Sequence, residues 1–404
     1  MTTIVIVGGG QAAGQAAASL RQEGYEDRIV LIGDEAVPPY QRPPLSKQYL
    51  SGEHDVDKIM LRPEKFYLDR EIELRLNTTV TSIKPQENLI KIGEESISYD
   101  KLLIATGSRP RKLSLPGSDL QGIYYLRTKA DVDDIRSAMG DARSLCIVGG
   151  GYIGLEVAAV AKSAGLEVHV LEMESRILQR VTTEAMSAFY HQLHTDRGVH
   201  IHTNTACSGF VGEGGRVTGV QCQTEVINAD MVIVGIGIIP NTELAEAAGL
   251  TTDNGIVVDD HCRTSDPDIY AAGDCTNHPN PILGRRLRLE SVPNAMDQAR
   301  TAASNMLGGD KSYAAVPWFW SDQYELKLQM VGFSSDGSEA VCRGEPTSLQ
   351  FAQFYLHDGA VVAVDAVNSP KEFMVAKQLY GKKVNPSELA DPTTDLKAIL
   401  ASAG

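Results

Sequence analysis

The chain has 404 residues, which suggests about two to three domains, and its 43% of hydrophobic residues is ordinary for a globular protein. The 37 Lys and Arg residues are outnumbered by 52 Asp and Glu residues, so the formal net charge is −15. This acidity argues against a general nucleic-acid binder, which needs a basic surface. No span reaches the ~18 apolar residues that a membrane helix requires.

The cysteines are widely spaced, and no two lie within four residues of each other: Cys146, Cys207, Cys222, Cys262, Cys275 and Cys342. This spacing excludes CxxC redox motifs, zinc knuckles and Cys-ligated iron–sulfur runs. It favours reduced thiols over a disulfide framework. No Lys or Arg precedes Arg21, whereas a signal peptide has a basic start, so we expect a cytoplasmic protein.

A first Gly-rich turn lies near the N-terminus. An apolar run over residues 4–7 predicts a strand, Gly8-x-Gly10-x-x-Ala13 opens a helix that ends near Gly24, and residues 29–32 predict the next strand. In such a turn the first Gly permits tight bending, the second lets a pyrophosphate approach the backbone, and a small third residue lets helix and strand pack closely. The helix N-terminus attracts the phosphates. An ordinary Gly turn is the alternative interpretation.

The same pattern returns 141 residues later. Residues 145–148 predict a strand, Gly149-x-Gly151-x-x-Gly154 is the full fingerprint, and Glu172 ends the strand that follows. Two fingerprints imply two dinucleotides, for which one nicotinamide and one flavin are the usual reason. A carboxylate such as Glu172 accepts hydrogen bonds from a ribose 2′-OH but repels a 2′-phosphate, so NADH is favoured over NADPH. Arg176 and Arg180 weaken this preference unless they occupy a solvated helix face.

Further buried strands are predicted over residues 102–104, 231–234 and 269–271, each followed closely by Gly. Asp274, just after the third of them, is placed to accept hydrogen bonds from the ribityl hydroxyls of FAD; a helix N-cap is the alternative. Residues 290–294 open a helix to about residue 307, whose N-terminal amides would stabilise negative charge on a reduced flavin.

After residue 313 the pattern changes to strands over 326–333, 349–357 and 361–367 and a helix over 370–380. We therefore expect an α/β protein with two Rossmann-like dinucleotide-binding domains and a C-terminal α+β domain. The expected boundaries are 1–110 with 241–313 for a discontinuous FAD-binding domain, 111–240 for an NAD-binding domain, and 314–404 for the C-terminal domain.

The chain resembles the glutathione-reductase-like, FAD-dependent ferredoxin reductases of bacterial oxygenase systems nearly end to end. The most specific block is Pro39-Tyr40-Gln41-Arg42-Pro43-Pro44-Leu45-Ser46-Lys47, and three further blocks support it: residues 105–107, 125–128 and 318–323. Related disulfide reductases carry a redox Cys pair after the second strand. Residues 1–145 contain no Cys, so a dithiol relay and a single-Cys NADH oxidase are both excluded. The missing dithiol also favours a monomer.

The resemblance implies an NADH-dependent flavoprotein. Hydride passes from NADH to FAD, and single electrons then pass to a [2Fe–2S] ferredoxin that supplies a cytochrome P450 or a ring-hydroxylating dioxygenase. A rubredoxin or monodehydroascorbate-type reductase is one alternative. A redox-sensing FAD/NADH interaction protein is another.

The resemblance also assigns roles to individual residues. Lys47, Glu156 and Trp320 are the expected catalytic residues, with Lys47 paired to Glu156. A surface or capping carboxylate is the alternative for Glu156, and a core aromatic for Trp320. The expected FAD contacts are Gly8, Gly10, Ala12, Ala13, Asp34, Glu35, Arg42, Lys47, Val80, Ala105, Thr106, Gly107, Arg127, Asp274, Glu290, Val292 and Trp320. The expected NAD contacts are Gly149, Gly151, Tyr152, Ile153, Gly154, Glu172, Gly235, Ile236 and Gly237.

An acidic ferredoxin requires a local basic patch on this acidic chain. We expect Arg300 to dock the ferredoxin, with Arg285 and Arg286 as weaker candidates. A solvated surface is the alternative interpretation of these arginines.

Overall fold

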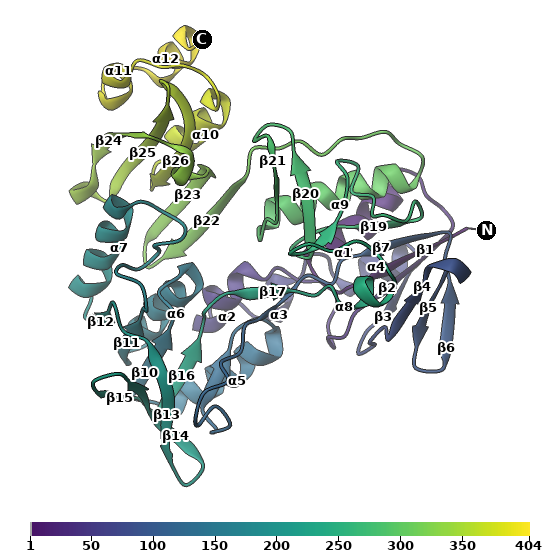
Figure 1. The fold of residues 1–404 in the computed structure, drawn as a ribbon, viewed down its shortest axis with the longest axis horizontal. Helices are drawn as coiled ribbons and strands as arrows, with labels where there is room; N and C mark the ends of the chain where they lie inside the picture. The colour runs from purple at the N-terminus through teal and green to yellow at the C-terminus, as the bar shows by residue number, and fades with distance from the viewer. Residues whose placement is uncertain (1) are drawn as a thin grey trace. The chain divides into compact units, whose positions relative to one another are not determined.

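The structure, a computed structural model, describes residues 2–404. The chain divides into two compact units, and each consists of three segments. The first unit holds Met1–Arg42, His54–Arg109 and Ile238–Ala315, and the second holds Pro43–Glu53, Pro110–Gly237 and Val316–Gly404. Figure 1 labels their elements.

The first unit is built on a parallel sheet of order β19-β7-β1-β2-β3. Its strands are β1 (Thr3–Val7), β2 (Arg28–Ile32), β3 (Ile72–Arg75), β7 (Lys101–Ile104) and β19 (Ile269–Ala271). Alternate side chains of these strands face opposite ways. One face packs on the small residues of α1 (Gln11–Gln22) and α9 (Val292–Met306), and the other on an antiparallel sheet of β4 (Ser82–Lys84), β5 (Leu89–Ile92) and β6 (Glu95–Ser98).

The second unit repeats this plan. Its parallel sheet has the order β12-β11-β10-β16-β9, and β13, β14 and β15 form a separate antiparallel sheet that packs on one face. The strands are β9 (Ile123–Tyr125), β10 (Ser144–Val148), β11 (Glu167–Leu171), β12 (Val199–His202), β13 (Cys207–Glu213), β14 (Arg216–Cys222), β15 (Val226–Asn228) and β16 (Met231–Val234). The helices are α5 (Lys129–Asp141), α6 (Tyr152–Ser163) and α7 (Glu184–Asp196).

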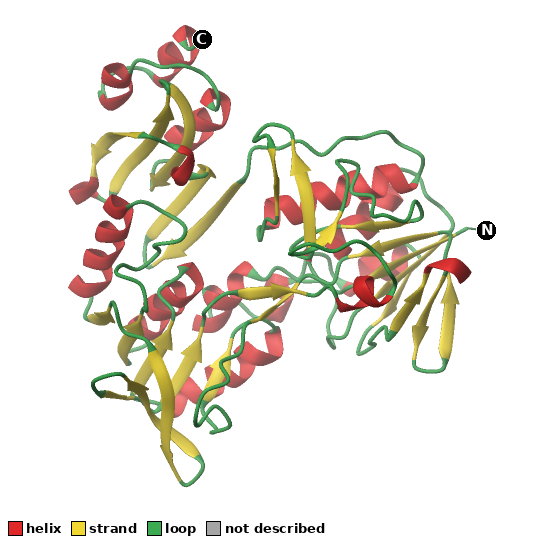
Figure 2. Ribbon diagram, in the orientation of Figure 1, coloured by secondary structure: helices red, strands yellow, loops and turns green. Residues whose placement is uncertain are grey.

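The C-terminal part of the second unit is an antiparallel sheet of order β22-β23-β26-β25-β24, drawn in yellow with its red helices in Figure 2. Its elements are β22 (Trp318–Gln323), β23 (Leu326–Gly332), β24 (Glu339–Glu345), β25 (Gln350–His357), β26 (Ala360–Val367), α10 (Pro370–Leu379), α11 (Pro386–Ala390) and α12 (Leu396–Ser402). The predicted strands and helix are present here, whereas β22 and β24 were not predicted.

The remaining elements are short: α2 (Gln48–Ser51), α3 (Val56–Ile59), α4 (Glu64–Asp69), α8 (Glu243–Ala247), β8 (Ser108–Pro110), β17 (Ile238–Pro240), β18 (Ile256–Val257), β20 (Thr276–Asn280) and β21 (Arg285–Leu287). The predicted fold class is confirmed. None of the helices within residues 2–404 combines the length and apolarity needed to cross a membrane.

Candidate functional site

The first Gly-rich turn joins β1 to α1. Gly8 has φ +133°, and a Cβ there would lie 2.1 Å from the carbonyl oxygen of Ala105, so only Gly fits. Gly10 is the N-cap of α1, and the nearest atoms to a Cβ there would be the Arg42 guanidinium at 4.0 Å. The N-terminal amides of α1 are therefore approachable by a phosphate, and the interpretation as an ordinary Gly turn loses its force.

The carboxylates after β2 differ from each other. Glu35 forms an ion pair with Arg42 at 2.8 Å and accepts a 2.5 Å hydrogen bond from the Tyr40 hydroxyl. Asp34 is exposed to solvent. The Glu35 carboxylate is thus held by two protein side chains, whereas Asp34 faces water.

Asp274 lies in the turn between β19 and β20, so the alternative that it caps a helix is wrong. It accepts a 2.9 Å hydrogen bond from the Ser108 hydroxyl. The preceding Gly273 donates its amide to Gln298 of α9 at 2.8 Å, and a Cβ there would meet the Ala12 methyl at 3.3 Å. The turn is therefore hydrogen-bonded to α9 and lies close to α1.

The other predicted FAD contacts of the first unit differ in their burial and in their hydrogen-bond partners. Val80 and Ala105 are buried, and the Thr106 hydroxyl donates to the Asn241 carbonyl at 2.8 Å. Val292 is half-buried at the start of α9. Glu290 is exposed and pairs with Arg288 at 2.5 Å. Lys47, Arg127 and Trp320 belong to the second unit.

The second Gly-rich turn has the same geometry as the first. Gly149 has φ +116°, and a Cβ there would lie 2.3 Å from the Gly235 carbonyl oxygen. A Cβ on Gly154 would lie 2.2 Å from the Gly149 carbonyl oxygen, which accounts for the small third residue. At Gly151 no heavy atom comes within 4 Å of a Cβ, so the N-terminus of α6 is open. Ile153, in the first turn of α6, is exposed.

Glu172 directly follows β11 and accepts two backbone hydrogen bonds of 2.9 Å, from the amides of Gly150 and Glu174. The alternative that Arg176 and Arg180 lie on a helix face is wrong, because both belong to the non-helical segment between β11 and α7. The Arg176 guanidinium donates to the Thr182 carbonyl and the Ser187 hydroxyl, and these hydrogen bonds stabilise the segment between β11 and α7. Arg180 is exposed, and its guanidinium lies 4.0 Å from where a Cβ on Gly237 would be.

A buried ion pair lies within the second unit. Lys47 Nζ contacts Glu156 Oε2 at 2.7 Å, with side-chain exposures of 9% and 2%. The Ser46 hydroxyl donates to the same oxygen at 2.5 Å, and the Ser321 hydroxyl donates to Oε1 at 2.7 Å. Burying a charge is costly unless it is paired and hydrogen-bonded, and here three donors meet one carboxylate. The expected pairing is present, and the surface alternative for Glu156 is wrong.

The two serines were not predicted. Ser46 precedes Lys47 in the most specific block, and Ser321 follows Trp320, so their position beside predicted residues was the available signal. Trp320 itself is half-buried in β22, 5.8 Å from Trp318 between ring centroids. Successive side chains of a strand face opposite ways, so Ser321 rather than Trp320 lies on the Glu156 side of β22.

A chain of polar side chains continues from Ser321. Gln323 donates to the Ser321 hydroxyl at 3.2 Å, and its Oε1 lies 2.8 Å from His194 Nε2 on α7. The other ring nitrogen of His194 lies 3.1 Å from the Tyr324 hydroxyl. Burial lowers the pKa of His194 to about 4, so the imidazole is neutral at pH 7.

The cysteines do not form a redox pair. All six are free thiols, and Cys146, Cys222, Cys262 and Cys275 are buried. Burial raises the pKa of the Cys275 thiol, which disfavours the reactive thiolate.

The pyridine nucleotide-disulphide oxidoreductase family model matches residues 2–299, and a reductase C-terminal model matches residues 318–400. The chain belongs to this family. The oxidoreductase is 42% identical to rhodocoxin reductase of Rhodococcus erythropolis, over 99% of this chain and 94% of the relative. It is 43% identical to putidaredoxin reductase of Pseudomonas putida, over 99% and 97% respectively. In the crystal structure of a covalent putidaredoxin reductase–putidaredoxin complex, a chain 43% identical matches with a TM-score of 0.96, over 100% of this chain and 99% of that one.

Reductases of this family use FAD and NAD(P)H. The residues of this oxidoreductase fit both groups. Each Gly-rich turn leaves a helix N-terminus open at its second Gly, where a Cβ would otherwise stand between backbone and pyrophosphate. A carboxylate follows the second strand of each sheet, Asp34 after β2 and Glu172 after β11, and such a group can accept hydrogen bonds from a ribose.

Proposed function

We propose that this protein passes electrons from NADH to a [2Fe–2S] ferredoxin that supplies a cytochrome P450 or a ring-hydroxylating dioxygenase. The observation that carries the proposal is similarity over nearly the whole length to reductases named for small redox proteins, in a chain without Cys in residues 1–145. Without a dithiol, the protein has no internal relay between the cofactor and its acceptor.

FAD, when bound, supplies two-electron acceptance of hydride and release of electrons one at a time. In the proposed assignment the first Gly-rich turn, Asp34 and Asp274 hold FAD, with the other FAD contacts named above. The second Gly-rich turn and Glu172 hold NADH, with residues 235–237 beside them. Lys47 and Glu156 orient the nicotinamide. Trp320, which faces away from Glu156 on β22, is assigned as the aromatic that packs near the flavin and the nicotinamide.

Lys47 also supplies a positive charge close to a buried carboxylate. Because Glu156 is held by Lys47, Ser46 and Ser321, it is fixed in one orientation, which favours a positioning role over proton transfer. We assign the three functional domains as 1–110 with 241–313, 111–240, and 314–404. The free cysteines favour the reducing conditions of the cytoplasm.

Docking of an acidic ferredoxin is proposed at Arg300, with Arg285 and Arg286 as weaker candidates. The Arg300 side chain is 42% exposed and pairs with Asp297 of the same helix at 2.8 Å, a partly exposed contact that costs little to exchange. The Arg286 guanidinium is already engaged, because it donates to Asn277 and to the Val258 carbonyl.

The docking assignment is tested with Arg300→Glu. We expect ferredoxin-dependent turnover to fall by about tenfold or more at low ionic strength, while NADH–ferricyanide activity stays unchanged. Arg28→Glu is the matched control, because Arg28 is 41% exposed and also pairs with a carboxylate, Glu73, at 2.9 Å. Equal turnover of the two variants would refute docking at Arg300.

The function itself is tested by the absorbance spectrum of the purified protein, followed by anaerobic titration with NADH and then NADPH. We expect a flavin spectrum bleached by about one equivalent of NADH and only slowly by NADPH. Acceptor assays with a [2Fe–2S] ferredoxin, a rubredoxin and monodehydroascorbate then separate the related reductases. A long-lived reduced flavin–NAD complex with poor turnover on every acceptor would favour the redox-sensing alternative, and a protein that takes up no FAD would overturn the proposal.

A further inference from the structure

A cluster of imidazoles lies on one face of the parallel sheet of the second unit, at its edge strand β12. Glu167 and His169 belong to β11, and His200 and His202 belong to β12. His169 is the register partner of His200, and Leu171 is the partner of His202. Because alternate residues of a strand face the same way, the pairing gathers all four side chains on one face.

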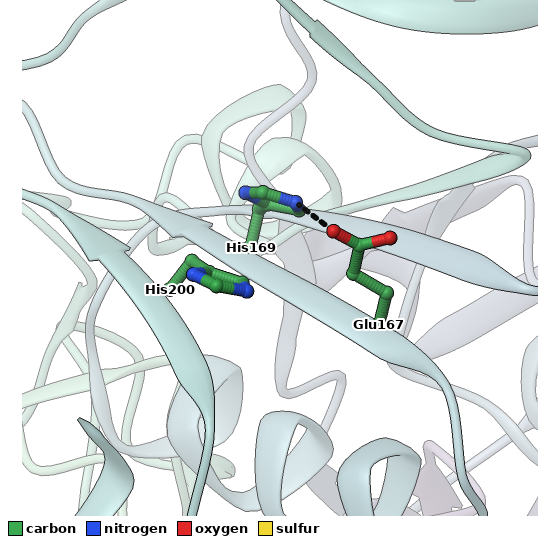
Figure 3. A group of neighbouring side chains, drawn as sticks. All are labelled: Glu167, His169 and His200. Carbon is green, nitrogen blue, oxygen red and sulfur yellow. Dashed lines mark hydrogen bonds and ion pairs between the residues drawn. The ribbon is translucent and has the colours of Figure 1, made fainter. Parts of the chain in front are cut away.

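The nitrogen and oxygen atoms of this cluster lie close together. Figure 3 shows the Glu167 carboxylate directed at the His169 ring, with the His200 ring beside it. The rings of His169 and His200 are stacked with centroids 4.8 Å apart. One ligand atom from each of Glu167, His169 and His200 lies within 4.8 Å of the other two.

The separation of the Glu167 and His169 ligand atoms suits a metal ion better than a hydrogen bond. His169 Nε2 and Glu167 Oε1 are 3.4 Å apart, beyond the usual 2.7–3.2 Å of an N–H···O bond. Two ligand atoms held about 2.0–2.2 Å from a tetrahedral Zn²⁺ are separated by about 3.3–3.6 Å. The pair therefore already stands at the separation that Zn²⁺ imposes.

His202 orients His169. Its Nε2 lies 3.1 Å from His169 Nδ1, which leaves His169 Nε2 as the nitrogen directed at Glu167. Metal-bound imidazoles are commonly held in this way through their second nitrogen. Glu167 and His200 are exposed and His169 is half-buried, so an ion can enter from solvent.

We propose that Glu167, His169 and His200 bind a divalent cation of the Zn²⁺ class. Two imidazoles and one carboxylate are a known Zn²⁺ ligand set, with the fourth position open to water. His202 is the positioning residue. The ion would join β12 to β11 and stabilise the folded protein by mass action, because an unfolded chain does not hold the three ligands together.

A second group of possible ligands, Asp259, Asp260 and His261, provides a contrast. Both ring nitrogens of His261 are engaged by carboxylates, of Asp260 at 2.8 Å and of Asp310 at 2.9 Å. No imidazole lone pair is left for an ion there, so this group carries no metal site in our interpretation.

The test uses the full-length protein with its flavin, stripped with EDTA and titrated with ZnCl₂ against a chromophoric chelator. We expect one Zn²⁺ per chain and a rise in the thermal unfolding midpoint with Zn²⁺ concentration. His200→Ala and Glu167→Gln should each weaken binding by about tenfold or more, and His202→Ala by about 10–100-fold. His191→Ala is the control, because His191 is exposed on α7 outside the cluster.

Each variant is first compared with the parent for flavin absorbance and unfolding midpoint without Zn²⁺. If His200→Ala alone misfolds, Glu167→Gln decides the question, since it keeps the size of the side chain. Zn²⁺ binding that survives both substitutions, or that is lost in His261→Ala, would overturn the proposal. So would the absence of Zn²⁺ binding by the unaltered protein.

Discussion

The two dinucleotide-binding folds share one plan and differ in the side chains that it carries. The parallel sheets correspond strand by strand: β3-β2-β1-β7-β19 in the first unit matches β12-β11-β10-β16-β9 in the second. Each fold also has its own three-stranded antiparallel sheet. At the edge formed by β2 and β3, Glu73 pairs with Arg28 at 2.9 Å and with Arg75 at 2.6 Å. The corresponding edge of β11 and β12 holds the cluster of three imidazoles and Glu167. One backbone plan therefore supports an ion-pair edge in one copy and a candidate metal site in the other.

The first helices differ just as sharply. Gln15 stands five positions after Gly10, as Glu156 stands five after Gly151. Gln15 donates to Ser19 of its own helix at 3.0 Å, whereas Glu156 is buried in the pair with Lys47. The position on the helix is the same, yet only the second copy places a charge there.

The largest expected effect on stability follows from removing the charge that pairs with Glu156. Lys47→Met leaves Glu156 buried without its counter-charge, which costs about 3–5 kcal/mol and lowers the thermal unfolding midpoint by about 10 °C. Lys47→Met with Glu156→Leu should recover most of the loss, because no buried charge then remains. Gln15→Leu, the control in the first fold, should change the stability by about 1 kcal/mol or less. Circular dichroism melts measure all three, and a Lys47→Met protein as stable as its parent would contradict the account.

Acidification should affect both units, through one buried histidine in each. Burial lowers the pKa of His194 and of His278 to about 4. An unfolded chain binds the proton near pH 6.5, so each site stabilises the fold above that pH and loses this contribution as the pH falls toward 4, by up to about 3 kcal/mol per site.

The two histidines should respond differently to replacement. Neither nitrogen of His278 has a hydrogen-bond partner within residues 2–404, so His278→Phe should be nearly neutral at pH 7 and stabilising at pH 5. His194→Phe should be destabilising by about 1–3 kcal/mol at pH 7, because it removes the hydrogen-bond partner of Gln323 Oε1 and of the Tyr324 hydroxyl. Thermal unfolding at pH 7 and pH 5 measures both variants. Equal changes in the unfolding midpoint of His278→Phe and His194→Phe would contradict the predicted difference.

The two Gly-rich turns should be separable by substitution. A methyl group at Gly149 meets the Gly235 carbonyl in a backbone conformation that costs about 1–3 kcal/mol for other residues. Gly149→Ala should therefore raise KM for NADH by about tenfold or more while flavin content is retained. Gly8→Ala should instead yield protein largely without flavin. Steady-state kinetics and the ratio of flavin to protein absorbance distinguish them, and loss of flavin from Gly149→Ala would refute the assignment.

The smallest effect is expected at the strand-end carboxylates. Glu172→Ser removes the charge that opposes a 2′-phosphate, so the ratio of kcat/KM for NADH over NADPH should fall by about tenfold. Glu35→Gln, in the first fold, should leave this ratio unchanged. A ratio that does not move in Glu172→Ser would assign the preference to other groups, with the exposed Arg180 as the first to examine.

Local patterns were sufficient for the strand, turn, helix and strand that begin each fold, but not for β3, β9 or the strands β12 to β15. Short β-branched runs followed by Gly and small residues predict strand, turn and helix, because each feature reflects the geometry of a few neighbouring residues. The strands β22 and β24 escaped prediction for physical reasons. The polar side chains of Ser321 and Gln323 in β22 are buried and hydrogen-bond to distant segments. In β24, Arg343 is buried and donates to backbone carbonyls of α11 and of the segment after it.

Contacts between distant segments were beyond local patterns. Ser321 reaches Glu156 across 165 residues, and the imidazole cluster forms only when β12 pairs in parallel with β11. Lys47 and Glu156 could be paired beforehand only through the family resemblance, since nothing near either residue indicates the other.

The division of the chain has a consequence for anyone who wishes to take the protein apart. The path changes unit after Arg42, Glu53, Arg109, Gly237 and Ala315. Any gene fragment that ends at one of these points lacks a segment of at least one unit, and the short piece Pro43–Glu53 carries Lys47 away from a fragment that begins at residue 110. A single crossover in the gene between residues 47 and 156, made to exchange nicotinamide specificity between relatives, would therefore separate Lys47 from its own Glu156.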